Sequence, residues 1–290
     1  MKTVYVIGSI NTDLVIGAPY MPASGETLTG SGFFTAHGGK GANQAVAAAR
    51  LGGKVVMCAC VGDDDFGKLA IQALQKDGID TRFVRIVENT PTGTAVIVVV
   101  DGDNRIILDK GANACLSEQD VEKALAEAEE GDILLTQLEN PVDIVGFALK
   151  KGKEKGMKVI LNPAPADVHA EKYLNACDLV IPNETETEIF GGRENILKKT
   201  GGNLIVTLGS KGFEIIQNYT ANSYPCIKVK AVDTTAAGDT FCGGLVAKLA
   251  DGESLEEAAK FGSLAASIAC TRKGAQPSVP TKEEVETYKA

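Results

Sequence analysis

The chain has 290 residues, of which 44% are hydrophobic, and its formal net charge is −9. This length suits one large α/β domain or two smaller ones, and the excess of acidic residues argues against nucleic acid or an anionic membrane as a partner. Seven scattered cysteines and only two histidines argue against a zinc centre or a disulfide scaffold, so we expect a reducing, cytoplasmic location.

Short β-rich runs alternate with helical patterns along most of the chain. We predict strands at 4–7, 55–61, 132–138, 158–161, 179–181 and 204–208, and helices at 66–77, 117–130 (with Ser117 as N-cap), 142–155, 238–249 and 255–269. The first apolar run is too short for a signal peptide or a membrane helix. The alternation predicts a mainly parallel sheet with helices on both faces, whose ligands bind beyond the carboxyl ends of the strands.

Two segments, 13–37 and 94–108, contain β-like pieces and no helical pattern. The second is a predicted hairpin, in which Asp-Gly-Asp-Asn joins 94–100 to 105–108. Together the two segments could form a small sheet that closes over a site and excludes water. On the residues alone, an ordinary surface hairpin is the slightly favoured alternative.

The segment Asp233-Thr-Thr-Ala-Ala-Gly-Asp-Thr-Phe-Cys-Gly-Gly244 places a small-residue turn and the carboxylate of Asp239 at the start of a predicted helix. A helix N-terminus gathers free N–H groups and partial positive charge, so it can bind an anion. A carboxylate there would repel a phosphate, but it could take a proton from a hydroxyl that attacks that phosphate. The alternative is a common helix start with Asp as a cap.

Three glycines surround Lys40 in Gly38-Gly-Lys-Gly-Ala-Asn-Gln44, and an Ala-rich helical run follows Asn43. Bare backbone and a helix mouth would let a ligand approach closely, and the donors there suit sugar hydroxyls as well as phosphates. The spacing of a Walker phosphate loop is absent. A flexible loop before a helix is an equally good interpretation of this segment alone.

Polar residues also follow the predicted strands. Asn11 and Asp13 come after 4–7 with the alternate spacing that points two side chains the same way, so they could grip vicinal hydroxyls, or they could form a turn. Glu139 comes directly after 132–138, at the edge where a parallel sheet places functional groups. The segment after 4–7 lacks the dinucleotide fingerprint, which argues against a nicotinamide dehydrogenase.

Two further loops could bind a nucleotide and its metal ion. Asn183 and Glu186 follow the strand at 179–181 and could hold Mg²⁺ through water, although capping of a helix by Asn183 is the commoner role. Thr207-Leu-Gly-Ser-Lys-Gly212 is a strand end with a glycine turn that suits contact with a nucleotide, or an ordinary β-turn.

Taken in chain order, six segments resemble the ribokinase branch of the PfkB carbohydrate kinase family. Each is weak evidence alone, whereas all six in order are specific, and the resemblance covers nearly the whole chain. The segments are Gly8-Ser-Ile-Asn-Thr-Asp13, Gly38-Gly-Lys-Gly-Ala-Asn-Gln44, Pro182-Asn-Glu-Thr-Glu186, Thr207-Leu-Gly-Ser-Lys-Gly212, Asp233-Thr-Thr-Ala-Ala-Gly-Asp239 and Thr271-Arg-Lys-Gly-Ala-Gln-Pro-Ser278.

The resemblance implies an ATP-dependent sugar kinase that phosphorylates the primary hydroxyl of D-ribose and gives ribose 5-phosphate and ADP. Asp239 would be the general base, and the N–H groups of Ala236, Ala237 and Gly238 would stabilise charge on the transferred phosphoryl group. The sugar-binding positions that it implies are Asn11, Thr12, Asp13, Gly39, Lys40, Gly41, Asn43, Glu139 and Asp239.

The same resemblance implies ATP, Mg²⁺ and K⁺ as cofactors. The positions implied for ATP are Asn183, Glu186, Thr207, Leu208, Gly209, Ser210, Lys211, Gly212, Gly238 and, where residue identity varies within the family, Ser263. Asn183 and Glu186 would organise Mg²⁺ through water. The K⁺ loop would comprise Asp233, Thr235, Ala269, Arg272, Gly274 and Ser278, mostly through backbone carbonyls.

The domain organisation that the resemblance implies is an α/β core at 1–12, 38–93 and 109–290 with a β lid at 13–37 and 94–108. In ribokinases the lid also forms a homodimer interface, so we expect a homodimer. Two alternatives stay open: the same chemistry on deoxyribose, fructose, a ketodeoxy sugar acid or a nucleoside, and a non-catalytic regulator on the same fold. The low aromatic content (5%, no Trp) disfavours a nucleoside, and the intact Asp239 turn disfavours a regulator.

Overall fold

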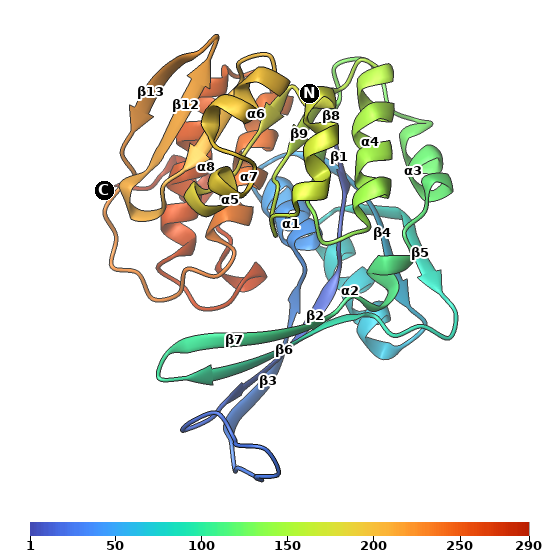
Figure 1. The fold of residues 1–290 in the computed structure, drawn as a ribbon, viewed down its shortest axis with the longest axis vertical. Helices are drawn as coiled ribbons and strands as arrows, with labels where there is room; N and C mark the ends of the chain where they lie inside the picture. Colours follow the sequence, from blue (N-terminus) through green and yellow to red (C-terminus); the bar gives the residue numbers. More distant parts are fainter. Residues whose placement is uncertain (290) are drawn as a thin grey trace.

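A nine-stranded sheet lies at the centre of the molecule (Figure 1). The computed structural model describes residues 1–289. The strands from β11 to β5 run parallel, and β12 and β13 add an antiparallel hairpin at one edge. The order across the sheet is β13 (Thr220–Tyr224), β12 (Phe213–Gln217), β11 (Leu204–Thr207), β10 (Leu179–Val180), β9 (Lys158–Leu161), β8 (Ile133–Thr136), β1 (Thr3–Ile7), β4 (Lys54–Gly62) and β5 (Asp80–Val87).

Helices cover both faces of this sheet because its buried strands present apolar side chains to both sides. Along β1, Val4 and Val6 join the core under one set of helices, and Tyr5 and Ile7 join the core under the other. The first set is α1 (Lys40–Arg50), α2 (Asp65–Lys76), α7 (Ala237–Ala250) and α8 (Leu255–Ala269). The second set is α3 (Glu118–Leu125), α4 (Val142–Glu154) and α6 (Arg193–Lys199), and Phe190 at the end of α5 (Glu184–Ile189) joins the same core. The short helix α9 (Lys282–Glu286) packs near α8 and α1.

The predicted α/β alternation is confirmed, with one helix shorter than expected. Ser117 caps α3 and forms a reciprocal capping box with Asp120. The helix ends at Leu125, about five residues before the predicted end at 130. The carboxylate of Asp132 accepts the backbone N–H of Glu129, a donor that a continuing helix would need for itself.

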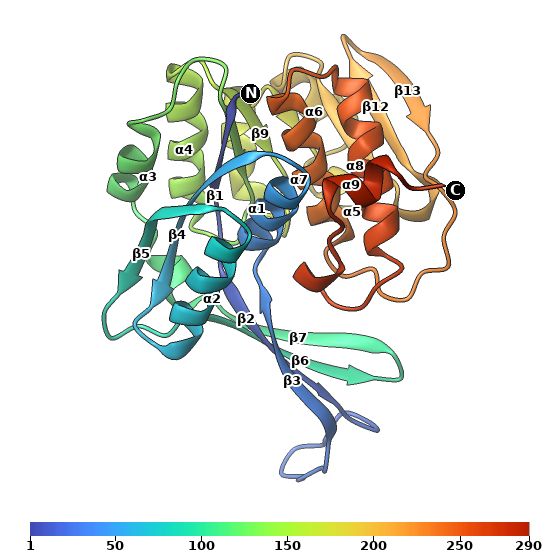
Figure 2. The ribbon, with the colours of Figure 1, turned by 180° about the vertical axis from the view of Figure 1, so that it is seen from behind.

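A second sheet of four strands stands apart from the main body and forms a lid (Figure 1; Figure 2). Its order is β3 (Ser31–Gly38), β2 (Asn11–Gly17), β6 (Gly93–Val100) and β7 (Asp103–Asp109). The β6–β7 hairpin turns through two residues, Asp101 and Gly102, with φ of 52° and 84°. Both central residues therefore have positive φ, as a type I′ turn requires, and the turn is shorter than the four residues predicted.

Helices α1 and α7 pack unusually close to one another, and both begin on the same side of the sheet. A Cβ on Gly243 of α7 would lie 2.4 Å from Ala47 Cβ and 2.7 Å from Ala48 N of α1. Glycine therefore permits an approach that a larger residue would prevent. Within the described residues, no helix combines the length and the apolarity needed to cross a bilayer.

Candidate active site

Asp239 lies in the first turn of α7, and its carboxylate is held by two amides from α1. Asn43 Nδ2 donates to one carboxylate oxygen at 3.1 Å, and Gln44 Nε2 donates to the other at 2.9 Å. The residue is 7% exposed. Asp239 is not a capping residue, because the N-cap of α7 is Ala236 and no side chain caps the helix. The alternative prediction of an Asp cap is therefore wrong.

The backbone ahead of Asp239 presents N–H groups at the start of α7. Ala236 adopts the left-handed conformation with φ of 57°, which turns the chain into the helix. The Ala237 N–H donates to the Thr234 carbonyl at 3.2 Å. Among residues 1–289, the N–H groups of Ala236 and Gly238 donate to no protein acceptor, and the space beside Gly238 is open.

Residues after β1, at the start of β2 and after β8 form a polar wall near Asp239. Glu139 Oε2 accepts the hydroxyl of Ser9 and, at 2.9 Å, the backbone N–H of Lys40. Lys40 is the first residue of α1, between Gly39 and Gly41. Because Oε2 already has these two donors, Oε1 is the oxygen that Glu139 can offer to a ligand.

Asn11 and Asp13 share one face of β2, and Asn113 sets the orientation of the Asn11 amide. Asn113 Oδ1 accepts the Ile10 N–H at 2.9 Å, so its Nδ2 must face the other way, where it donates to Asn11 Oδ1 at 2.7 Å. The two amides fit because Gly93 has no side chain: a Cβ there would lie 2.2 Å from Asn113 Nδ2. Asn11 therefore presents its NH₂ group outward.

Thr12 lies between these two residues on the strand. Its side chain is buried on the opposite face of β2, so only its backbone could contact a ligand beside Asn11 and Asp13.

Charges within the site act strongly on one another. Burial lowers the pKa of Lys40, but the carboxylates of Asp239, Glu139 and Glu186 more than offset it, and the net result is a raised pKa. Burial raises the pKa of Asp13 to about 6, and Glu139 adds to this shift. Burial also raises the pKa of Glu186. The structure therefore places three predicted carboxylates, those of Asp239, Glu139 and Glu186, around the ammonium group of Lys40, and Asp13 interacts with this group of charges through Glu139.

The loops after β10 and β11 lie side by side at the same edge of the sheet. Asn183 caps α5 and forms a capping box with Glu186, with both reciprocal hydrogen bonds at 2.8 Å. Thr207 N donates to the Pro182 carbonyl at 2.9 Å, which ties the two loops together. The rest of the predicted nucleotide loop, Leu208, Gly209, Ser210, Lys211 and Gly212, forms a tight turn that Leu208 N closes onto the Gly212 carbonyl. Ser263 is part-exposed on α8, which packs beside α7.

The predicted cation loop is closed by the side chain of Asp233. Its carboxylate accepts from the Thr235 N–H and hydroxyl and, at 2.9 Å, from the Gly274 N–H. Within the described chain, the backbone carbonyls of Asp233, Thr235, Arg272 and Gly274 accept no protein hydrogen bond. The side chain of Arg272 instead pairs with Glu284 at 2.7 Å. Of the other two predicted positions, the Ala269 carbonyl accepts the Arg272 N–H and the Ser278 hydroxyl donates to Ala275.

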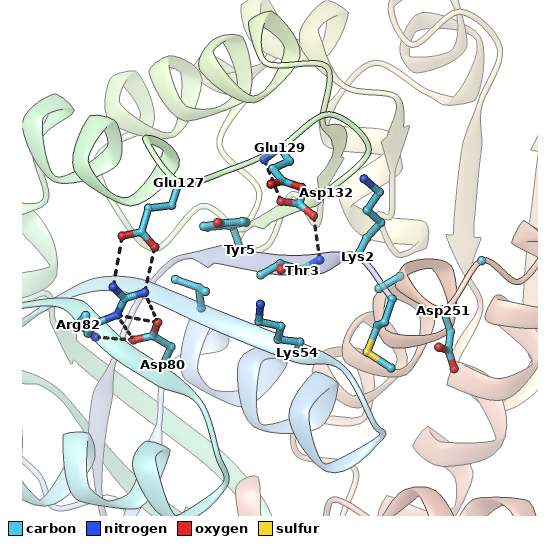
Figure 3. A pocket seen from close by; sticks show the side chains of 14 residues that line it. Lys2, Thr3, Tyr5, Lys54, Asp80, Arg82, Glu127, Glu129, Asp132 and Asp251 are labelled. Atoms are coloured by element: carbon cyan, nitrogen blue, oxygen red, sulfur yellow. Dashed lines mark hydrogen bonds and ion pairs between the residues drawn. The ribbon is translucent and has the colours of Figure 1, made fainter.

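A separate hollow of about 560 Å³ lies at the opposite, amino end of β1, β4 and β5 (Figure 3). Arg82 on its wall is already paired with Asp80 and Glu127. None of the predicted site residues lines it, so it is distinct from the candidate active site.

Three comparisons with known proteins agree in what they match. The profile described as "pfkB family carbohydrate kinase" matches residues 1–282. The chain belongs to the pfkB family of carbohydrate kinases. A ribokinase of Haemophilus influenzae is 44% identical over 98% of this chain and 97% of its own length, and a deoxyribokinase of Salmonella typhi is 38% identical over 98% and 97%. A structure of Arabidopsis thaliana ribokinase complexed with ribose and ATP has a TM-score of 0.88 and 33% identity, covering 98% of this chain and 97% of that one.

Sequence reasoning missed three residues that shape the site of this pfkB-family kinase: Ser9, Gln44 and Asn113. Ser9 and Gln44 lie inside segments that were singled out, so their position was the available signal. Asn113 gives no local signal, because its partner Asn11 is 102 residues away in the chain.

We predict that Asp13→Asn stabilises this pfkB-family kinase at neutral pH. The raised pKa means that the folded state holds a proton on Asp13 up to about pH 6, whereas the unfolded chain releases it near 3.8, so ionisation costs stability as pH rises through that window. The variant should gain on the order of 1–3 kcal/mol in the free energy of unfolding above pH 6 and nothing below about pH 4. Denaturant unfolding at several pH values checks this. Asp103→Asn, on exposed β7, is the control, and an unchanged pH profile in Asp13→Asn would contradict the prediction.

Proposed function

We propose that this carbohydrate kinase transfers the γ-phosphoryl group of ATP to the primary hydroxyl of D-ribose, forming ribose 5-phosphate and ADP. The observation that carries the proposal is the buried Asp239 carboxylate, held by two amides beside the open N–H groups of α7. The identity to a ribokinase and the likeness to a structure with ribose and ATP favour this substrate pair.

Asp239 is the proposed general base. A carboxylate that keeps acceptor capacity beyond its two amide contacts can take the proton of a sugar hydroxyl as that oxygen attacks phosphorus. The N–H groups of Ala236 and Gly238, with the positive end of α7, would stabilise the negative charge that develops on the transferred group. The Ala237 N–H contributes less directly, because it already donates to Thr234.

The sugar would lie against Asn11, Asp13, Asn43 and Glu139, with the backbone of Gly39, Lys40 and Gly41 close by. Asn11 offers a donor, whereas Asp13 and Glu139 Oε1 offer acceptors. A ribose hydroxyl both donates and accepts, so a pair of neighbouring hydroxyls matches this wall. Deoxyribose is the alternative that a specific finding supports, since a deoxyribokinase is 38% identical.

The chain offers ligands that fit the two metal ions. Mg²⁺ would sit beside Asn183 and Glu186 through water and neutralise charge on the nucleotide phosphates; the capping box leaves Glu186 Oε1 uncommitted. K⁺ would be held by the carbonyls of the 233–235 and 269–278 loops, and the free carbonyls of Asp233, Thr235, Arg272 and Gly274 suit a hard cation. The nucleotide would contact the 207–212 loop and Ser263.

We also propose that the lid joins two copies of the chain. Strand pairing places Leu14, Val96 and Ile107 in one row on the face of the lid opposite Asp13. Ile107 is 72% exposed and Val96 is 39% exposed. Closure of the lid over its own site would not cover this apolar row, whereas the lid of a second copy would.

We expect the protein to phosphorylate D-ribose with a kcat/KM about tenfold to a hundredfold above that for 2-deoxy-D-ribose. The reason is that a missing hydroxyl leaves a charged or amide partner unpaired in the site. A coupled ADP-release assay with ATP and Mg²⁺, run in K⁺ and in Na⁺, measures this and the expected K⁺ activation together.

Other sugars and nucleosides belong in the same panel. Activity on a different sugar alone would contradict ribose as the substrate but would support the proposed phosphoryl transfer. Equal rates in K⁺ and Na⁺ would count against the cation loop. No ADP release with any substrate would refute kinase activity and favour the alternative of a non-catalytic sugar-binding regulator.

Asp239→Asn should fold normally and lower kcat by about 10²–10⁴-fold, because the substituted amide cannot accept the hydroxyl proton. Sugar binding by calorimetry and thermal unfolding would show that the site survives. Asp251→Asn, at the exposed end of the same helix, is the control and should leave kcat unchanged. Turnover near that of the wild type in Asp239→Asn would remove this carboxylate from the mechanism.

Ile107→Asp should convert the expected dimer into a monomer of 30.3 kDa, because a carboxylate cannot be buried unpaired in the interface. Sedimentation equilibrium gives the mass directly. Leu69→Asp, at an exposed apolar site on α2 outside the lid, is the control and should not alter the mass. A wild-type protein that is strictly monomeric would refute the dimer.

A further inference from the structure

Gln44 contacts the proposed base but has no access to a substrate. Its side chain is fully buried, whereas its neighbour Asn43 lies nearer the surface of the site. Gln44 Nε2 donates to Asp239 at 2.9 Å and also to Asn162 Oδ1 at 2.9 Å, and its Oε1 accepts from Gln137 Nε2 at 2.6 Å. The amide therefore uses both of its hydrogens and its oxygen inside the protein.

A backbone carbonyl determines which end of the Gln44 amide faces Asp239. The carbonyl of Ile181 can only accept, so the group of Asn162 that faces it at 2.8 Å must be the NH₂ group. Asn162 then presents Oδ1 to Gln44, and the group of Gln44 that donates to this oxygen must be its NH₂ group. The second hydrogen of that group points at Asp239. Neither the Asn162 amide nor the Gln44 amide can be flipped without placing two hydrogen-bond acceptors face to face.

We propose that Gln44 is a positioning residue for the base and that Asn162 fixes its polarity. This role rests on the proposed function, since it concerns the carboxylate that takes the hydroxyl proton. With Gln44 donating to one oxygen and Asn43 to the other, the plane of the carboxylate cannot rotate about its Cβ–Cγ bond. The hydrogen bonds that connect Asp239 to Gln44 and Asn162 end at the carbonyl of Ile181, two residues before Asn183. The base is therefore linked to the loop that carries the proposed nucleotide residues.

Two substitutions at position 44 separate this role from simple space-filling. Gln44→Leu keeps the volume but removes the donor, so we expect kcat to fall by about tenfold to a hundredfold with little change in the KM of either substrate. Gln44→Glu keeps the shape of the side chain but replaces the donating NH₂ group with an oxygen that accepts when ionised. We therefore expect its kcat at neutral pH to stay below that of the wild type. Two carboxyls at hydrogen-bond distance can share one proton, so the rate of Gln44→Glu relative to the wild type should decline as pH rises.

Asn162→Leu and Thr240→Val complete the set. Asn162→Leu acts one step further from the base and should lower kcat less than Gln44→Leu. Thr240→Val removes a buried hydroxyl that has no partner in the described structure, next to Asp239 in the chain, and should leave kcat as it is. Thermal unfolding and sugar binding by calorimetry accompany each variant.

Measurement of the wild type comes first. A wild type that phosphorylates no sugar refutes the proposed function, and the role of Gln44 with it. An active wild type with an unchanged kcat in Gln44→Leu, or with full activity in Gln44→Glu at neutral pH, refutes the positioning role alone. If Gln44→Leu does not fold, Gln44→Glu and Asn162→Leu still decide the question, because a normal kcat in both would overturn it.

Discussion

The close packing of α1 against α7 is the constraint on which the site depends. Asp239 and its two amide partners are separated by about 195 residues in the chain, yet they meet at hydrogen-bond distances of 3.1 and 2.9 Å. These distances require the first turns of two helices to lie almost in contact. Gly243 allows that approach one turn below Asp239. The packing of α1 against α7 therefore determines the position of the proposed base.

Electrostatics set the second condition, because the site gathers carboxylates in a protein that is already acidic. Burial together with neighbouring carboxylates raises the pKa values of Asp13 and Glu186, so the free site holds its charges at a cost in stability. Groups that donate hydrogen bonds or carry positive charge relieve that cost. Sugar hydroxyls and cations have this property, whereas a bare nucleotide does not, and its phosphates need the N–H groups of α7 and a counter-ion.

Local patterns predicted the order of strands and helices, the hairpin of the lid and the place of Asp239 in the first turn of a helix, because each depends on neighbours in the sequence. The β12–β13 hairpin was missed. Its turn, Asn218 and Tyr219, has φ of 48° and 63°. Glycine usually occupies such positions, and without it the sequence shows no sign of a turn. Asn113 was missed for another reason: its contact with Asn11 spans 102 residues of the chain, which no spacing rule encodes. Gln44 lies inside a segment of predicted importance, but its contact with Asp239 spans 195 residues, so the segment alone did not indicate its role.

Buried amides give the site its chemical polarity, and backbone groups fix those amides in turn. The Ile10 N–H orients Asn113, which leaves Asn11 as a donor, just as the Ile181 carbonyl orients Asn162 and, through it, Gln44. The wall therefore offers one fixed donor beside the acceptors Asp13 and Glu139. A purely accepting ligand would satisfy Asn11 and repel the carboxylates, whereas adjacent hydroxyls satisfy all three. The proposed preference for a polyol would thus follow from backbone hydrogen bonds that lie behind the residues proposed to contact it.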